Sequence, residues 1–416
     1  MNNNLIKLLG TKDRQVGATA FILPLLSLVT LWGVSLCSFI FFLVALYHFR
    51  ASRSALAHHW REVRWVVGAF ALYLLFTLAS MLIHPQPGAG AIEQPFRMLA
   101  GVSALTLVLA FKPDRRYLWW GVAGGALLGA ILVGVERFVF EIDRPGGLTN
   151  PITTGDVLLL YGLVGLAAAI DTRGAFHSLW LGAGAIAGFA GSLITGTRGG
   201  WIALGMAAIV FVLYGQALRS ARVRMLVAGS VALVLAAWFI PATGVRARVD
   251  QGVADITTYY DGGSAFSNVG IRLELWKGAA MLIAERPLLG IDHPGAKKEM
   301  ARYVREGKLD AVVLPAEHFH NDMLQVLVVG GVAGLLAWLP ILGAPLAFFA
   351  RVLASRRHAG KDAFAAALAG MLVVVSYFAF GLTEVIFWSV KASLLYALMV
   401  FILMGLCLNA KETDGK

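Results

Sequence analysis

Charged residues are scarce in this sequence of 416 residues. Asp, Glu, Lys and Arg together make up 14% of it, and hydrophobic types make up 58%. A soluble globular domain typically has about 25% charged and about 45–50% apolar residues. The composition therefore excludes an ordinary soluble domain. Apolar stretches of roughly 17–25 residues, long enough to cross a bilayer, recur along the chain, which predicts an all-α polytopic membrane protein.

Cysteine is also nearly absent, and this excludes two further classes of site. Cys37 and Cys407 both lie inside apolar runs, so they provide neither a disulfide framework nor a spaced set of metal ligands. We find no internal repeat and no low-complexity tract. The net charge of +11 would suit a nucleic-acid partner, but the basic residues sit in the short segments between apolar runs, and we therefore expect no nucleic acid.

Hydropathy, with charged breaks as punctuation, predicts about twelve membrane spans. The first run, from Val16, continues into a second without a small-residue cleavage site, so we expect a retained anchor rather than a removed signal peptide. The expected spans are residues 16–31, 33–49, 65–83, 97–111, 117–135, 153–170, 178–195, 199–217, 225–240, 322–347, 363–383 and 388–408.

Glycine is abundant, with 46 residues, and some of it follows a pattern. In the stretches 121–129 and 182–191, small residues recur about four apart. Small residues at this spacing let helix backbones approach closely in lipid. We therefore expect tight helix packing at these two stretches.

Lys and Arg in the short loops predict the orientation. They gather around residues 7–14, 50–64, 112–116, 219–224 and 351–361, and they are sparse in the alternate loops. Both termini are then cytoplasmic. The polar segment 241–321, between the ninth and tenth spans, is external within one integral-membrane domain of residues 1–416. Helical spacing in Gly270–Glu285 and Pro294–Lys308 predicts that this segment is a folded helical cap.

Three arginines on the external side are candidates for binding an anion. Arg198 lies in the turn Thr195-Gly196-Thr197-Arg198-Gly199, Arg272 follows Gly270-Ile271, and Arg144 opens a turn rich in Gly and Pro. The planar guanidinium suits phosphate oxygens. Each has a plainer alternative: Arg198 could reach toward lipid headgroups, Arg272 could pair with Glu274 or Glu285, and Arg144 could be an ordinary turn residue.

Two histidines stand where the polar segment enters the tenth span. His318 and His320 lie in Glu317-His318-Phe319-His320-Asn321-Asp322. A water-accessible histidine with an ordinary pKa near neutrality can take a proton from a hydroxyl. A metal site and a structural role are the alternatives, although no second ligand cluster with recognisable spacing appears. Arginines and histidine on one face predict a phosphorylated, lipid-borne substrate that meets a base.

The motifs resemble those of the O-antigen ligase family, within the superfamily of O-antigen ligases and polymerases. The most specific match is His320-Asn321, followed after nine residues by Gly331 and then by Gly334. The Arg198 turn and the Gly270-Ile271-Arg272 segment resemble the two arginine motifs of that superfamily. The resemblance extends over nearly the whole chain in span number, in the position of the long loop and in the order of motifs.

The resemblance implies a fold, an activity and roles for these residues. It implies a GT-C-like fold in the Gram-negative inner membrane, and metal-independent, inverting transfer of a polysaccharide from undecaprenyl diphosphate to a sugar hydroxyl of lipid A-core, without a cofactor. His320 would be the base, with Asn321 beside it and His318 as a second candidate. Arg198, Arg272 and, more weakly, Arg144 would bind the donor diphosphate.

Two other functions fit parts of the sequence. An O-antigen polymerase would use the same donor with a second lipid-linked glycan as acceptor, and a related oligosaccharyltransferase that glycosylates protein would usually be longer. A transporter or flippase is the common function of a protein with twelve spans, but it would place charged residues at the bilayer midplane. Here the charges lie at one face, and a ligase remains the preferred hypothesis.

Overall fold

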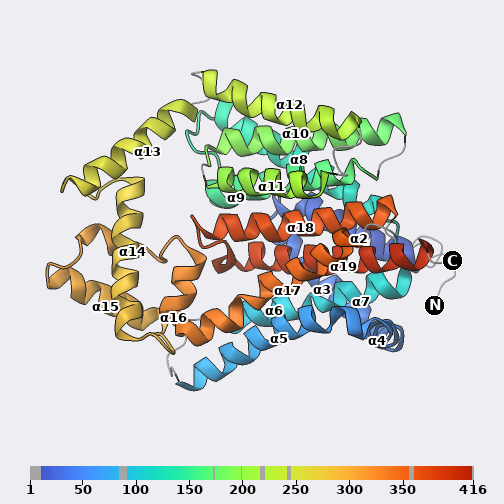
Figure 1. Cartoon of the computed structure of the whole chain (residues 1–416), viewed down its shortest axis with the longest axis horizontal. Coiled ribbons are helices and arrows are strands. Elements are labelled where there is room, and N and C mark those ends of the chain that lie inside the picture. The colour runs from blue at the N-terminus through green and yellow to red at the C-terminus, as the bar shows by residue number, and fades with distance from the viewer. Residues whose placement is uncertain are drawn as a thin grey trace.

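The fold is known from a computed structural model, which describes residues 11–83, 91–171, 174–197, 199–215, 221–240, 245–355 and 360–414. Every regular element in these ranges is a helix (Figure 1), as expected. The elements are α2 (Lys12–Ser27), α3 (Gly33–Tyr47), α4 (Phe49–His58), α5 (Trp60–Ile83), α6 (Glu93–Ala100), α7 (Val102–Phe111), α8 (Arg116–Phe138), α9 (Pro151–Ala168), α10 (Ala175–Thr195), α11 (Gly200–Leu213), α12 (Ala221–Phe239), α13 (Val245–Tyr260), α14 (Asn268–Glu285), α15 (His293–Arg305), η3 (Ala311–Val313), α16 (Asp322–Trp338), α17 (Pro340–Ala354), α18 (Lys361–Gly381), η4 (Ile386–Trp388) and α19 (Val390–Asp414).

Eight helical stretches of the described chain are long and apolar enough to cross a membrane, which indicates a multi-pass membrane protein. The number rises to nine if α3 and α4, bent by 94° at their junction, form one span. The expected twelve are not reached by this measure. Helix α2 has 16 residues and α11 has 14.

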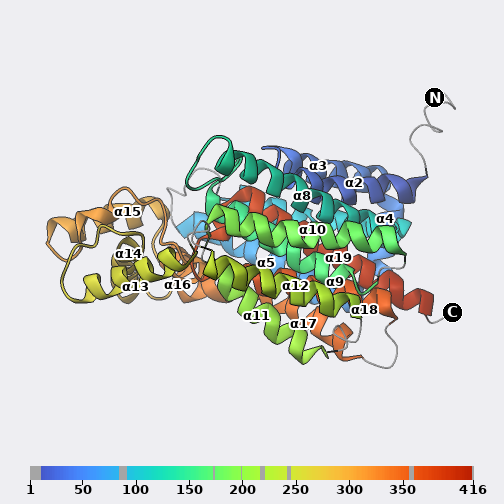
Figure 2. The same cartoon turned by 90° about the horizontal axis from the view of Figure 1, so that it is seen from above.

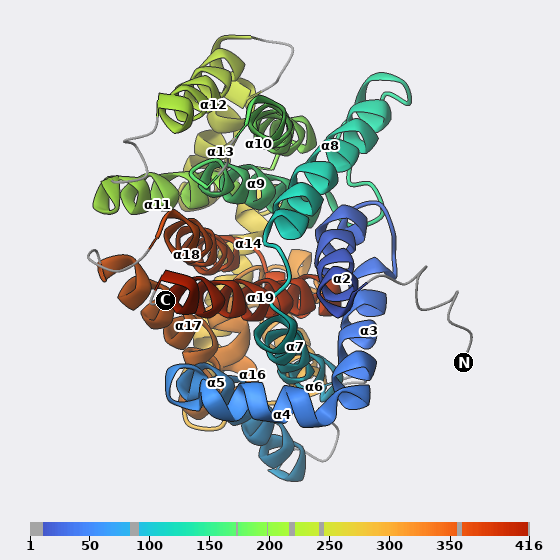
Figure 3. The ribbon, with the colours of Figure 1, turned by 90° about the vertical axis from the view of Figure 1, so that its right-hand side faces the viewer.

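Three helices form the centre of the bundle. The apolar stretches of α9, α18 and α19 are 89%, 94% and 89% buried, against 17% for α5. Seen along the bundle, α19 and α18 lie inside a ring of the other helices (Figure 3). Helix α5 instead exposes Leu72, Leu75 and Leu82, which fits a face in contact with lipid. The loop between α18 and α19 therefore joins two of the most buried helices of the described bundle.

Glycine allows close helix contacts in both predicted stretches. A Cβ added at Gly125 of α8 would lie 2.3 Å from the backbone oxygen of Pro24 in α2. A Cβ at Gly188 of α10 would lie 2.5 Å from the backbone oxygen of Leu158 in α9. Since real Cβ atoms do not approach so closely, the backbones meet only because these positions lack side chains.

The polar segment forms a helical extension at one end of the bundle, opposite the C-terminal end of α19 (Figures 1 and 2). Helix α14 corresponds to the helix predicted at residues 270–285, and α15 corresponds to the one predicted at residues 294–308. Helix α13 was not predicted. We call α13, α14, α15 and η3 the cap. The cap has its own small apolar core, which includes Leu275, Met300 and Tyr303 and reaches Val328 of α16.

Four helices at this end of the bundle are preceded by a residue whose side chain accepts a hydrogen bond from the first helical turn. The side-chain oxygens of Asn150, Ser267, Asp292 and Asn321 accept backbone N–H groups at the starts of α9, α14, α15 and α16, over 2.7–3.0 Å. A side-chain acceptor at this position satisfies one of the orphan donors of the first turn and typically stabilises a helix by about 1 kcal/mol. These hydrogen bonds fix the residue at which each of the four helices begins.

An ion-pair cluster joins the start of α8, the segment after α9 and the start of α18. Arg115, just before α8, donates from Nη2 to Asp171 Oδ1 at 2.8 Å and pairs with Asp362 Oδ2 of α18 at 2.7 Å. The Asp171 side chain is only 6% exposed, and its other partner is Trp119 Nε1 at 3.4 Å.

Replacing Arg115 with alanine is expected to lower the unfolding free energy by about 1–3 kcal/mol, because the Asp171 carboxylate would lose its charged partner while it stays buried. The melting temperature of detergent-purified protein, followed by tryptophan fluorescence, measures this loss. The control is Arg116→Ala: Arg116 is 57% exposed and its nearest carboxylate, Asp114, is 4.0 Å away. Equal melting temperatures for both variants would show that the cluster does not stabilise the bundle.

Candidate active site

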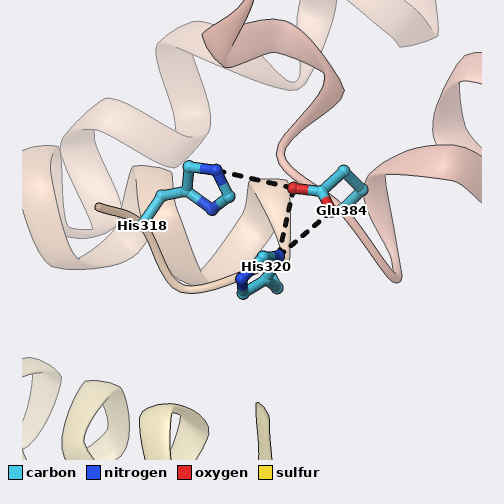
Figure 4. A group of neighbouring side chains, drawn as sticks. All are labelled: His318, His320 and Glu384. Atoms are coloured by element: carbon cyan, nitrogen blue, oxygen red, sulfur yellow. Dashed lines mark hydrogen bonds and ion pairs between the residues drawn. The ribbon is translucent and has the colours of Figure 1, made fainter. Parts of the chain in front are cut away.

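The two histidines meet a carboxylate at the junction between the cap and the bundle. His318 and His320 lie on the segment between η3 and α16, and Glu384 lies on the loop between α18 and η4. Figure 4 shows both imidazole rings turned toward the Glu384 carboxylate. The Glu384 side chain is only 4% exposed. A carboxylate from the loop between the two central helices therefore faces the predicted catalytic histidines.

The backbone fixes His320 in an unusual conformation. Its φ angle is +49°, in the left-handed region that side-chain-bearing residues rarely adopt. Both neighbours are held: Phe319 donates its N–H to Gln325 and accepts from Trp276 Nε1, at 3.2 and 2.9 Å. Asn321 caps α16 and also donates from Nδ2 to the Leu382 carbonyl at 3.0 Å. The fold thus holds the His320 side chain in place at some cost in backbone strain.

Hydrogen bonding distinguishes the two nitrogens of His320. Nδ1 lies 3.1 Å from each of the two Glu384 oxygens, so an Nδ1–H donates to this carboxylate. The other ring nitrogen, Nε2, points away from Glu384 (Figure 4). Since an Nδ1–H leaves the lone pair of the neutral ring on Nε2, this arrangement suits a base that accepts a proton at Nε2.

His318 is placed differently. Its Nε2 lies 3.6 Å from Glu384 Oε1, and its Nδ1 is buried without a hydrogen-bond partner among the described residues. Burial lowers the pKa of the His318 imidazole below its usual value, with the charge of His320 adding to the effect, although Glu384 opposes it. Both nitrogens of His318 therefore face protein, and this histidine is less suited than His320 to meet a substrate.

Glu384 remains ionised despite its burial. Burial alone would raise the pKa of its carboxyl, but the hydrogen bond from His320, the charges of both histidines and the N–H of Val385 outweigh it, so that the pKa is lowered. A carboxylate in this state holds the proton on Nδ1 of His320 and stabilises the imidazolium that forms when Nε2 is protonated.

Arg272 belongs to the same group. It lies in the first turns of α14, and its Nη2 is 3.8 Å from Glu384 Oε2. The sequence had suggested Glu274 and Glu285 as partners of Arg272. In the structure, Glu274 accepts hydrogen bonds from Tyr259 and Lys277, and Glu285 pairs with Arg302. The Arg272 side chain is 28% exposed.

A pocket of about 400 Å³ gathers three of the six predicted site residues. His320 and Arg272 line it together with Arg144 and Thr383. Arg198 lies outside the described residues, but Thr197 and Gly199, its immediate neighbours, also line the pocket. Three motifs that are far apart in the sequence therefore converge on one cavity. His318 and Asn321 are not among the described residues that line this pocket.

Sequence reasoning did not identify Glu384. The available signal was an acidic residue in the short external turn between the last two apolar runs, Gly381-Leu382-Thr383-Glu384-Val385. An ionisable group beside two apolar spans is costly and often functional. Its partner His320 is 64 residues away in sequence, so the pairing itself has no local pattern.

His318, His320 and Glu384 could also hold a metal ion. One donor atom from each lies within 4.8 Å of the others, and no comparable group occurs elsewhere in the described ranges. Two histidines and a carboxylate form a known ligand set for zinc. The Arg272 guanidinium, 3.8 Å from Glu384, opposes a second cation at this point. The electrostatics therefore favour the hydrogen-bonded pair over a metal centre.

The cap is hydrogen-bonded to the bundle beside Gly331, the first glycine of the histidine motif. Gly331 interrupts α16 with φ +61° and ψ −162°, a combination open almost only to glycine. There Val332 and Ala333 donate their N–H groups to the carbonyls of Pro287 and Leu288, at 2.8 and 3.1 Å. The segment that follows α14 is thus bonded to the backbone of α16 at the kink.

Glu274 fixes the other side of the cap. Its carboxylate accepts Tyr259 OH at 2.6 Å and the Asp310 N–H at 2.9 Å. Burial, a hydrogen bond to Glu274 and its charge raise the pKa of Tyr259 to about 12, so the phenol keeps the proton it donates. Helix α13 and the turn before η3 are held against α14, which carries Arg272.

Comparison with known proteins supports a common family for the central part of this chain. An uncharacterized protein of Haemophilus influenzae is 23% identical to it over 300 residues, which cover 70% of this chain and 74% of that relative. A family model described as O-antigen ligase matches residues 183–339, a region that contains Arg198, Arg272, His318 and His320. The resemblance inferred from the motifs is confirmed for residues 183–339, which match the O-antigen ligase family model.

Proposed function

We propose that this protein transfers a glycan from a polyprenyl diphosphate to a sugar hydroxyl of a glycolipid. Specifically, the donor is O-antigen polysaccharide on undecaprenyl diphosphate and the acceptor is lipid A-core. The observation that carries the proposal is the single pocket lined by His320, Arg272 and Arg144. A base and two guanidinium groups around one cavity are what a hydroxyl acceptor and a diphosphate leaving group require.

The reaction is a single displacement. As the acceptor oxygen forms a bond to the anomeric carbon of the donor sugar, His320 Nε2 takes the hydroxyl proton. The bond between that carbon and the diphosphate oxygen breaks, and its electrons leave with undecaprenyl diphosphate. One displacement inverts the configuration at the anomeric carbon. We assign no cofactor and no metal to this step.

The arginines stabilise the leaving group. Arg272 and Arg144 line the pocket, and we place Arg198 with them because its flanking residues do so. Negative charge develops on the diphosphate as the bond breaks, and bidentate guanidinium donors neutralise it better than a point charge. Arg272 also faces Glu384, which links the leaving-group contacts to the base.

We place this chemistry on the periplasmic side of the bacterial inner membrane. The basic loops predict cytoplasmic termini, and the cap lies at the end of the bundle opposite the C-terminal end of α19 (Figure 1). We treat residues 241–321 as a cap within one integral-membrane domain. Both lipid-borne substrates would then meet at the periplasmic surface of the inner membrane, where we place the pocket.

The proposal is tested by deleting the gene and analysing lipopolysaccharide on gels, with and without the wild-type gene on a plasmid. We expect the deletion strain to lose the polymer ladder on lipid A-core while long glycan accumulates on undecaprenyl diphosphate, and the plasmid to restore the ladder. A strain that retains a single repeat on the core would indicate a polymerase. An unchanged ladder would leave transport as the better explanation.

A further inference from the structure

A second pocket, of about 440 Å³, lies beside the first. It is bordered by α5, α6 and α16 and by the loop that follows Glu384. Tyr73, Phe76 and Val329 give it apolar walls, and a smaller polar part contains Asp322, Gln325 and His293. Apolar walls with a few polar groups are typical of a small-molecule site. The roles assigned above leave this pocket unused.

The two pockets are lined by the residues on either side of Glu384 in the chain. They share no described lining residue, but Thr383 lines the first and Val385 the second, with Glu384 between them in sequence. A row of rings joins them as well. The centroid of the His318 ring lies 4.5 Å from that of His320 and 6.2 Å from that of Trp388, and Trp388 lines the second pocket.

The pockets differ in charge. The first pocket is lined by Arg144 and Arg272 and by one acidic residue, Asp143, which pairs with Arg137 at 2.8 Å. Among the described residues that line the second, none is Lys or Arg, and three are acidic: Glu93, Asp292 and Asp322. Glu93 is partly neutralised by Arg97 at 2.7 Å. A phosphate would find no cationic partner in this described lining, whereas carboxyl and amide groups hydrogen-bond to neutral hydroxyl groups.

Two buried polar atoms in the second pocket lack partners. Asp322 Oδ2 and Gln325 Nε2 have no hydrogen-bond partner among the described residues, and their residues are 2% and 5% exposed. They lie one turn apart on α16. One is an acceptor and the other a donor, and leaving such groups unsatisfied costs about 1–3 kcal/mol each. A ligand with hydroxyl groups can satisfy both.

We propose that the second pocket binds a hydroxyl-bearing sugar of the acceptor glycolipid. Asp322 and Gln325 hydrogen-bond its hydroxyls, and the indole of Trp388, which is 47% exposed, packs against the apolar face of the sugar ring. The first pocket then holds the donor diphosphate, and the part of the acceptor that carries the reactive hydroxyl enters the same pocket, which His320 lines. This inference rests on the proposed function and adds a specificity site to it.

The test uses two variants of the full-length protein in nanodiscs. Gln325→Glu removes the N–H donor but keeps the oxygen that accepts from Phe319. Trp388→Leu removes an exposed ring at little cost to folding. The probes are lipid A-core, for acceptor binding without donor, and undecaprenyl diphosphate, for the donor site. We expect both variants to weaken acceptor binding, and to raise the acceptor KM, by tenfold or more, with undecaprenyl diphosphate binding unchanged.

The control is Ser376→Ala, which removes another buried hydroxyl without a described partner, in α18 and outside both pockets. It should bind both probes like the wild type. If the wild type transfers glycan and both variants keep an acceptor KM within twofold, the acceptor site lies elsewhere and the proposed function stands. If the wild type neither binds lipid A-core nor transfers glycan to it, the proposed function itself fails.

Discussion

His320→Asn is expected to reduce glycan transfer by about 10²–10⁴-fold, the usual range for loss of a general base. Asparagine is the suitable replacement because residue 320 has φ +49°, and asparagine tolerates the left-handed region better than alanine does. The variant therefore removes the imidazole while preserving the backbone. Transfer is measured with purified protein, lipid-linked donor and lipid A-core, under single-turnover conditions.

Donor binding separates loss of the base from loss of the site. Undecaprenyl diphosphate should bind His320→Asn about as tightly as wild type, because Arg272 and Arg144 still line the pocket. Arg272→Lys should instead weaken that binding, since an ammonium does not reproduce the guanidinium fork. If His320→Asn transferred glycan at near the wild-type rate, another group, with His318 the first candidate, would be the base.

Glu384→Gln tests how the carboxylate supports His320. The amide keeps an oxygen that can accept from Nδ1–H, but it lacks the charge that stabilises an imidazolium. Transfer should fall to a level between those of wild type and His320→Asn. If Glu384 only supported the fold, its variant would lose stability without this intermediate rate, and melting curves recorded on the same samples tell the two apart.

Hydropathy was sufficient for most of the bundle. Long apolar runs are readily identified as spans, because a helix satisfies its own backbone hydrogen bonds inside the bilayer. The method was weaker for short helices. Helices α2 and α11, with 16 and 14 residues, are predicted spans that fall below the length that hydrophobicity alone requires. Their place depends on contacts with neighbours, which a single apolar run does not encode.

The cap was predictable only in part. Residues 270–285 and 294–308 carry helical spacing and charge patterns that do not depend on neighbours. Helix α13, over residues 245–260, was not predicted. It is held by Tyr259 against Glu274 of α14, a contact between residues 15 apart, and such tertiary contacts override local propensity.

The site shows the same division between local and long-range information. His320, Arg272 and Arg144 each lie in a recognisable local motif, and the structure brings them to one pocket. Glu384 has no such motif and gains its meaning only from the approach of the α18–α19 loop. Likewise Arg272 faces Glu384, whereas sequence proximity had offered Glu274 or Glu285. Motifs identified the reacting groups, and the fold supplied the partner that orients them.

The spacing from His320 to Gly331 has a physical reason. Asn321 starts α16, and Gly331 ends its first part where the cap segment docks. A Cβ at Gly331 would lie 2.3 Å from the backbone carbon of Leu288, and one at Gly290 would lie 2.6 Å from Gly331 N. The two glycines therefore interlock two backbones. The motif fixes the distance between the histidine and the point where the cap is attached.

Gly331→Ala is accordingly expected to cost about 3 kcal/mol or more of stability, from a forbidden backbone conformation together with steric overlap. The strain would be relieved by moving the cap segment off α16, and since α14 leads into that segment, Arg272 would shift away from Glu384. We expect a sharply lower melting temperature, faster proteolysis in the cap and almost complete loss of transfer.

Gly343→Ala is the matched control for this change. Gly343 lies in α17, and a Cβ there would meet nothing within 4 Å, so alanine should be neutral or stabilise the helix by about 0.5–1 kcal/mol. If Gly331→Ala melted like Gly343→Ala and kept its activity, α16 would tolerate a side chain at the kink. The glycine of the motif would then need an explanation other than cap docking, such as contact with a substrate.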